Sequence, residues 1–227
     1  MYNPTTESAT QIENFDDPIG DYHFYTSLDT PLKENAFELS DEEKIAVIQE
    51  HFAKIMDTLG LDLSDDSLAG TPKRVAKMFV KEKFRGLNEA NMPAISLFDN
   101  SYQYNRMLIE RNINVQSTCE HHFLPIYGKA HVGYISSGKV IGLSKINRIV
   151  DHFARRPQVQ ERMTKQILSA LQEALDTKDV IVVVDAKHMC VSSRGIEDHD
   201  SSTITLEYGG QFINQNKRYE FLKLVES

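Results

Sequence analysis

The chain is organised around one stretch, Ser117-Thr118-Cys119-Glu120-His121-His122-Phe123-Leu124-Pro125. This stretch places a thiol, two imidazoles and a carboxylate side by side. The chain has one other cysteine, Cys190, which lies far downstream and follows His188 by two residues. Because both cysteines stand beside histidines, the pattern indicates a single metal site that the fold assembles from two distant segments.

Cys119 and His122 are three residues apart, a spacing at which a tight turn can aim a thiolate and an imidazole at one ion. Cys190 would complete the set, and Zn²⁺ suits such mixed sulfur and nitrogen ligands. A structural zinc normally has four protein ligands. Three ligands leave a position for water, whose pKa falls from about 15.7 towards 7 on the metal. Three convincing ligands therefore favour a catalytic site.

Two further histidines are candidates for proton transfer near neutral pH, because His121 and His188 lie within two residues of a predicted ligand. Glu120 is either a further ligand or a partner that orients one of the imidazoles. The remaining histidines carry no such pattern and are interpreted as surface or hydrogen-bonded core residues: His23, His51, His131, His152 and His199.

The composition of the 227 residues, with 41% hydrophobic and 26% charged side chains, is that of one main globular domain. No apolar run approaches the roughly 20 residues that cross a bilayer, and residues 1–16 do not resemble a signal peptide. We therefore expect a cytoplasmic protein without a membrane partner. The net charge of −8 also argues against nucleic acid as a partner.

Residues 1–38 show no sustained period and are expected to form an extended arm, with Phe24, Tyr25 and Leu28 available for docking. Ser40 and Glu43 predict a capping box at the start of a helix that Gly60 ends. The spacing of its apolar residues predicts one buried face: Ile45, Ile48, Phe52, Ile55, Met56 and Leu59. Thr71 as cap and Pro72 in the first turn predict a second helix, whose apolar stripe comprises Val75, Met78, Phe79 and Phe84.

Further along the chain, strands are expected at 107–115, 129–135, 180–184 and 202–208, the third continuous and β-branched and therefore buried. Helices are expected from Ser144 as cap, over 159–175 and over 218–225. The core side of the 159–175 helix is predicted to comprise Met163, Ile167, Leu168, Leu171 and Leu175. This order favours an α+β fold, with an antiparallel sheet and helices on one face.

Cationic side chains form a second group. Lys145 and Arg148 share one face near a helix start, and Arg194 follows Cys190 closely. Together they are candidates for binding a phosphate chain, although surface Lys and Arg are usually only solvated. The proximity of Arg194 to the predicted metal site favours the phosphate interpretation.

Four motifs in this order resemble zinc-dependent GTP cyclohydrolase I: residues 117–123, 142–148 (Gly-Leu-Ser-Lys-Ile-Asn-Arg), 156–162 (Arg-Pro-Gln-Val-Gln-Glu-Arg) and 188–195 (His-Met-Cys-Val-Ser-Ser-Arg-Gly). The resemblance begins at about Leu39, so it leaves 1–38 as an N-terminal arm and implies a helical part (39–100) and a tunnelling-fold catalytic part (101–227). In that fold, sheets of five subunits close a barrel. Two rings make a homodecamer with active sites between subunits.

The resemblance implies that GTP and water give formate and 7,8-dihydroneopterin triphosphate, the first step of pterin and tetrahydrofolate synthesis. It assigns Cys119, His122 and Cys190 as zinc ligands, and a zinc-activated water would attack C8 of guanine. It assigns catalytic roles to His121 and His188, for proton transfer, and to Ser144, for the ribose portion. It also assigns Glu161 as the guanine anchor and gives Gln160 an amide contact with substrate. The triphosphate would be bound by Lys145, Arg148, Arg194 and, from another subunit, Arg74.

The residues leave two alternatives open and argue against a third. In a zinc-stabilised binding module, a fourth group would close the site. A zinc nucleobase deaminase needs an H-x-E and P-C-x-x-C pair, which the chain lacks. A relative of the same fold that acts on another purine or pterin is not excluded by Glu161, because that carboxylate would anchor such rings too. The strand segment Leu206-Glu207-Tyr208 departs from the family pattern, in which small hydroxyl residues are commoner.

Overall fold

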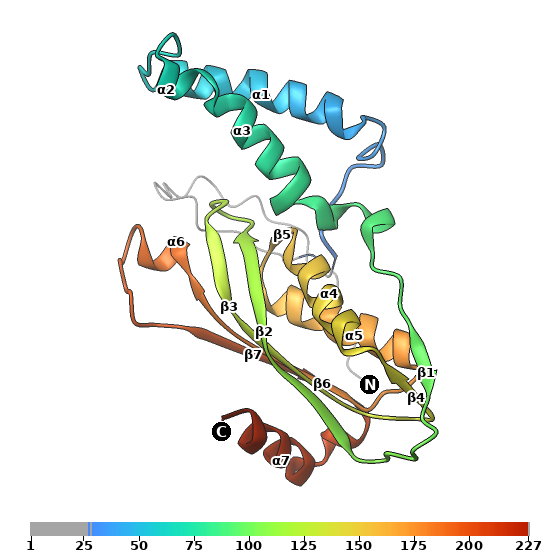
Figure 1. Cartoon of the computed structure of the whole chain (residues 1–227). Coiled ribbons are helices and arrows are strands. Elements are labelled where there is room, and N and C mark those ends of the chain that lie inside the picture. Colours follow the sequence, from blue (N-terminus) through green and yellow to red (C-terminus); the bar gives the residue numbers. More distant parts are fainter. Residues whose placement is uncertain (1–26, 28, 227) are drawn as a thin grey trace, which may run out of the picture.

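The computed structural model describes residue 27 and residues 29–226. The contacts expected for Phe24, Tyr25 and Leu28 lie outside the described residues. Within the described part, no helix is both long and apolar enough to cross a membrane. The helical segment of residues 41–91 lies at one end of a curled sheet (Figure 1). It comprises α1 (Asp41–Thr58), α2 (Asp66–Ala69), α3 (Thr71–Lys77), the π-helical η1 (Met78–Lys83) and the 3₁₀ segments η2 (Arg85–Leu87) and η3 (Glu89–Asn91).

Helix α1 begins with the predicted capping box: Glu43 N–H donates to Ser40 Oγ at 3.3 Å, and Ser40 N–H donates to the Glu43 carboxylate at 2.8 Å. Gly60, with φ +80°, follows its C-terminal end, as expected. The prediction of one fully buried face was wrong for Ile55 and Leu59, which are 52% and 72% exposed. The reason is that α1 packs against α3 and η1 at a distance from the sheet, so part of its apolar surface is left exposed by the described residues (Figure 1).

The predictions of Thr71 and Ser144 as side-chain caps were wrong. Gly70 and Gly142 occupy the N-cap positions of α3 and α4 (Leu143–Ala154), and neither helix start has a side-chain cap. Thr71 is already the first residue of α3, and its hydroxyl accepts a hydrogen bond from Arg74 at 2.9 Å. Ser144 is likewise inside α4, one residue after its start.

The main sheet has the strand order β5-β2-β3-β6-β7. Strands β2, β3, β6 and β7 pair with one another in antiparallel fashion, and the short β5 pairs in parallel with β2. The strands are β2 (Met107–Cys119), β3 (Pro125–Ile135), β5 (Pro157–Gln158), β6 (Val180–His188) and β7 (Thr203–Tyr208). A separate pair is formed by β1 (Leu97–Asp99) and β4 (Lys139–Ile141). The predicted α+β fold is confirmed, while β1, β4 and β5 were not predicted.

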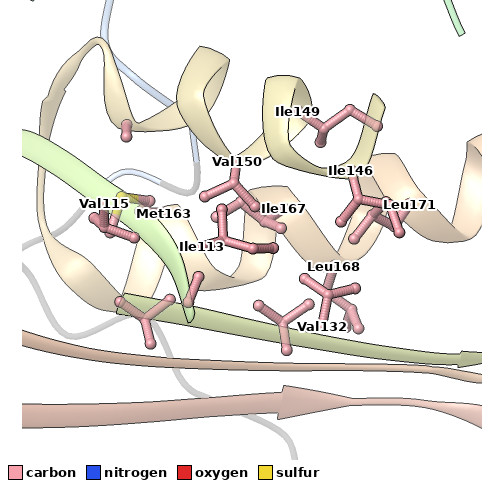
Figure 2. Packing of buried hydrophobic residues seen from close by; sticks show 14 of the residues in the cluster. Ile113, Val115, Val132, Ile146, Ile149, Val150, Met163, Ile167, Leu168 and Leu171 are labelled. Carbon is pink, nitrogen blue, oxygen red and sulfur yellow. The ribbon is translucent and has the colours of Figure 1, made fainter. Parts of the chain in front are cut away.

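The core lies between the sheet and the helices α4 and α5 (Gln160–Leu175). All five predicted core residues of α5 are buried, and they pack with β2, β3 and β6 (Figure 2). Strand β6 presents Val180, Val182 and Val184 to this cluster. Its alternate residues, Ile181 and Val183, face a second cluster under η4 (Gly210–Ile213) and α7 (Gln215–Glu226). Helices α4 and α5 thus cover one face as predicted, and the C-terminal helix covers part of the other.

Candidate metal centre and active site

The turn between β2 and β3 carries the first half of the site. Cys119 closes β2, its N–H donates to the Leu124 carbonyl at 2.8 Å, and its own carbonyl accepts from Phe123 N–H at 2.9 Å. Phe123 adopts a left-handed backbone with φ +53°, which is uncommon for a bulky residue and reverses the chain sharply. This reversal brings Cys119 and His122 to the same side of the turn.

Aromatic contacts hold the turn against the helical part of the chain. The ring of Phe123 packs edge-on against Phe84, with centroids 5.4 Å apart, and lies 6.4 Å from Phe79 of η1. Such pairs add about 0.5–1.5 kcal/mol beyond their buried area. The helical segment therefore stabilises a strained residue directly beside a predicted metal ligand.

Cys190 comes from the short helix α6 (Met189–Ser192), which follows β6. The β3–β6 register pairs Ile126 with His188, so the end of β6 lies beside the start of β3 and its turn. The ligand atoms of Cys119, His122 and Cys190 all lie within 4.8 Å of one another. Two thiols and one imidazole at this separation fit the donor set of zinc. The structure thus brings the three predicted ligands together.

The electrostatics of the ligand group also point to a cation. Burial and, to a smaller extent, the neighbouring Cys119 together raise the pKa of the Cys190 thiol to about 11. Two adjacent thiolates in such surroundings need a compensating positive charge, and a coordinated thiol is deprotonated by its metal. The group is therefore suited to a divalent ion.

A cavity of about 440 Å³ opens beside the ligand group. It gathers several predicted site residues from three separate segments, and its lining consists of Cys119, His121, Gln158, Val159, Gln160, Glu161, His188 and Cys190. Glu161 is exposed in the first turn of α5, where its carboxylate can reach a ligand. The cavity thus combines metal ligands, two histidines and a carboxylate in one concave site.

The two histidines differ in their surroundings. His121 is exposed, with Nδ1 3.8 Å from Cys119 Sγ and Nε2 4.0 Å from a Glu120 oxygen. His188 is half-buried, and its Nε2 is 2.8 Å from Gln160 Oε1. Burial lowers the pKa of His188, and the charge of Glu161 only partly opposes this shift. The His188 imidazole is therefore neutral near pH 7, a state in which it can accept a proton.

Glu120 is an ion-pair partner in this structure and does not belong to the ligand group. Its two oxygens accept from Nη1 and Nη2 of Arg162, at 2.6 and 2.9 Å. Arg162 is buried, and its Nε donates to the Ser27 carbonyl at 2.8 Å. No role of Arg162 is predicted from the sequence, although this residue directly follows Glu161. Its position in the third motif was the available signal.

Arg194 adjoins the ligand group, and its Nη1 donates to His122 Nε2 at 2.9 Å. Lys145 and Arg148 instead lie near the start of α4, which follows β4, whereas Cys119 pairs with β5 at the opposite end of the sheet (Figure 1). Arg74 bonds the Ser67 carbonyl and Thr71. These three cations and Ser144 do not line the described cavity.

Known proteins resemble this chain over most of its length. The family model described as GTP cyclohydrolase I matches residues 48–226. GTP cyclohydrolase 1 of Flavobacterium johnsoniae is 59% identical over 214 residues, which cover 94% of this chain and 96% of the relative. The protein of the same name from Aeromonas hydrophila is 55% identical, over 86% of this chain and 89% of the relative. The one from Yersinia enterocolitica is 54% identical, over 87% and 90%. Similarity of this extent shows that the chain belongs to the GTP cyclohydrolase I family.

Proposed function

We propose that this chain converts GTP and water to 7,8-dihydroneopterin triphosphate and formate, the entry step to pterins and tetrahydrofolate. One observation carries the proposal: the Cys119, His122 and Cys190 group opens to the same cavity as Glu161 and the two histidines. Family membership gives the reaction, and the cavity supplies groups for each part of it.

We assign Zn²⁺ to the group of Cys119, His122 and Cys190, because two thiolates and an imidazole within 4.8 Å match its ligand preference. When bound, the zinc would lower the pKa of a water and so supply a nucleophile at neutral pH. With three protein ligands, the site would remain open to water. This distinguishes it from a closed structural site.

Glu161 is the proposed guanine anchor. Its carboxylate lies in the cavity and can accept hydrogen bonds from both N1–H and the 2-amino group of guanine. Adenine has neither donor at these positions. Because a site built to pair with such donors strongly disfavours analogues that lack them, this carboxylate would select GTP over ATP.

The proton transfers are assigned to His121 and His188. His188, neutral near pH 7 because burial lowers its pKa, is ready to take a proton. His121 lies on the exposed side of the metal turn, 3.8 Å from Cys119 Sγ. Both line the same cavity as Glu161, so both can reach a base that this carboxylate holds.

Completing the site requires a second copy of the chain. Arg194 lies beside His122, but Ser144, Lys145, Arg148 and Arg74 are not among the residues that line the cavity of their own chain. In the proposed homodecamer, a dimer of pentamers, a neighbour supplies these side chains to the ribose and triphosphate. Arg would bind phosphate oxygens in pairs and so fix the position of the chain. We place this assembly in the cytoplasm, as the composition suggests.

The test is an assay of the purified, zinc-loaded protein with GTP. Formate release, together with a product that becomes fluorescent on oxidation, is the expected result, and ATP should give neither. Absence of both formate and pterin from GTP would reject the proposed reaction.

A further inference from the structure

The side chain of Gln160 contacts His188 at the wall of the cavity, which both residues line. Its Oε1 lies 2.8 Å from His188 Nε2, and Gln160 as a residue is only 1% exposed. The resemblance to the family gave this glutamine an amide contact with substrate. In the structure, both ends of the amide are already occupied by the protein.

The nitrogen end of the amide faces three acceptors. Gln160 Nε2 lies 3.0 Å from the Val184 carbonyl, 2.8 Å from the Thr203 carbonyl and 3.2 Å from Thr205 Oγ1. Turning the amide over would place its oxygen against two carbonyl oxygens, which cannot donate. The orientation with Oε1 towards His188 is therefore the one that satisfies these buried groups.

Two threonines fix the direction of the remaining hydrogen bonds. Thr164 Oγ1 donates to the backbone carbonyl of Gln160 at 2.8 Å and lies 2.6 Å from Thr205 Oγ1. Since the Thr164 hydrogen is used in the first bond, Thr205 donates in the second. Thr205 Oγ1 is then free to accept from Gln160 Nε2. Strands β6 and β7 and the start of α5 thus specify the amide orientation together.

We propose that Gln160 is the positioning residue of His188 and makes no direct contact with substrate. Because an amide oxygen can only accept, His188 Nε2 carries the hydrogen in this pair. In the neutral imidazole, Nδ1 is then the nitrogen that exchanges a proton with substrate. Gln160 therefore sets both the ring orientation and the reactive nitrogen of His188. This role rests on the proposed GTP reaction.

If Gln160 only positions His188, a change at Gln160 should lower kcat without weakening the binding of substrate. Gln160→Met keeps the length of the side chain but removes the amide. We expect kcat to fall on the order of 10- to 100-fold, as for loss of an orienting partner, with zinc content unchanged. The KM for GTP should stay within about twofold, because no bond to substrate is lost.

Gln166→Met is the matched control. Gln166 lies in the same helix, is also buried and uses its amide oxygen to accept from Gln158 at 2.9 Å. The same loss of a buried amide should leave kcat within about twofold of the wild type. This result would show that general loosening of α5 does not cause the fall in kcat of Gln160→Met.

Binding is measured separately by calorimetry in a His188→Ala background, where turnover does not interfere. Adding Gln160→Met to this variant should leave the Kd for GTP within about twofold. A direct contact with guanine would instead weaken binding in both backgrounds.

An unchanged kcat in Gln160→Met, or a raised KM or Kd for GTP, would overturn the positioning role. Should Gln160→Met fail to fold, Thr205→Val decides, because it removes only one of the bonds that orient the amide and should lower kcat without changing KM. A wild-type protein that is inert towards GTP would overturn the proposed function and this role together. An active wild type with an unaffected Gln160→Met overturns the role alone.

Discussion

Arg162 binds Glu120 through two parallel hydrogen bonds, of 2.6 and 2.9 Å, from beneath the metal turn. The guanidinium is buried, whereas the carboxylate is 22% exposed. This pair directs the side chain of Glu120 away from the ligands on either side of it, Cys119 and His122. It also links the turn to the start of α5, where the proposed guanine anchor Glu161 lies. This ion pair thus links the proposed metal subsite to the proposed base subsite.

Removing Arg162, the buried partner of this ion pair, should lower the stability of the fold. Arg162→Met leaves the Glu120 carboxylate without its guanidinium, and we expect a loss of about 3 kcal/mol in the free energy of unfolding. Denaturant unfolding at a fixed protein concentration measures the loss. Arg85→Met is the control, because Arg85 and Asp151 form an exposed pair whose loss should cost about 1 kcal/mol or less. Equal losses in the two variants would contradict the structural role of the pair.

The metal ligands and the proton-transfer residues should separate experimentally. Cys190→Ala should lose bound zinc and turnover together, because it removes one of three ligands. His188→Ala should retain zinc while turnover falls about 100- to 10,000-fold, the usual contribution of a general acid or base. Metal analysis and the formate assay on the same preparations measure both. Zinc loss in His188→Ala, or activity in Cys190→Ala, would contradict the assignment.

The stability of the fold should depend on pH through His152. This buried imidazole accepts from Arg156 Nη2 at 2.7 Å, and burial, followed by the charge of Arg156, lowers its pKa to about 4. The unfolded chain, with a histidine pKa of about 6.5, takes up a proton first as the pH falls. Between pH 7 and 5 this difference should remove about 2 kcal/mol of stability.

A variant isolates that contribution. His152→Gln keeps a hydrogen-bond acceptor for Arg156 but has no ionisable group, so its stability should fall less steeply between pH 7 and 5. Denaturant unfolding of both proteins at the two pH values gives the difference in slope. Parallel pH dependences would show that His152 does not contribute.

Sharing of the site between subunits can be tested by mixing two defective variants. Cys190→Ala loses the metal half of the site, and Lys145→Ala loses a triphosphate contact from the other half. Co-expression should restore activity, because about a quarter of the subunit contacts would pair two intact halves by random assortment. Each variant expressed alone is the control. No recovery in demonstrably mixed oligomers would indicate that each chain builds its site alone.

Short sequence patterns were sufficient to predict features that depend on residues within one helix. The spacing of Met163, Ile167 and Leu171 predicted the buried face of α5, and Ser40 with Glu43 predicted the start of α1. The short strands β1, β4 and β5 were missed, because two or three residues carry no measurable alternation. Ile55 was predicted as buried because periodicity marks an apolar face but does not show what covers it.

The metal group could be predicted because its residues are chemically distinctive. The ion-pair partner of Glu120 and the buried contacts of Gln160 could not be predicted, because these are common residue types whose roles depend on tertiary contacts. Glu120 and Arg162 are 42 residues apart, and no spacing rule relates them. Gln160 was assigned to substrate by resemblance, whereas its contacts with β6 and β7 appear only once the chain is folded.

The hydrogen bond from Arg162 to residue 27 uses a main-chain carbonyl. Any amino acid at this position supplies the same oxygen, so the contact tolerates sequence drift in the arm. A break in the polypeptide is different, because cleavage after residue 27 would detach the segment that precedes the helical part from the support of the metal turn. Residue 27 thus contacts the buried arginine through its backbone alone, and cleavage at this peptide bond would change the support of the turn where a substitution would not.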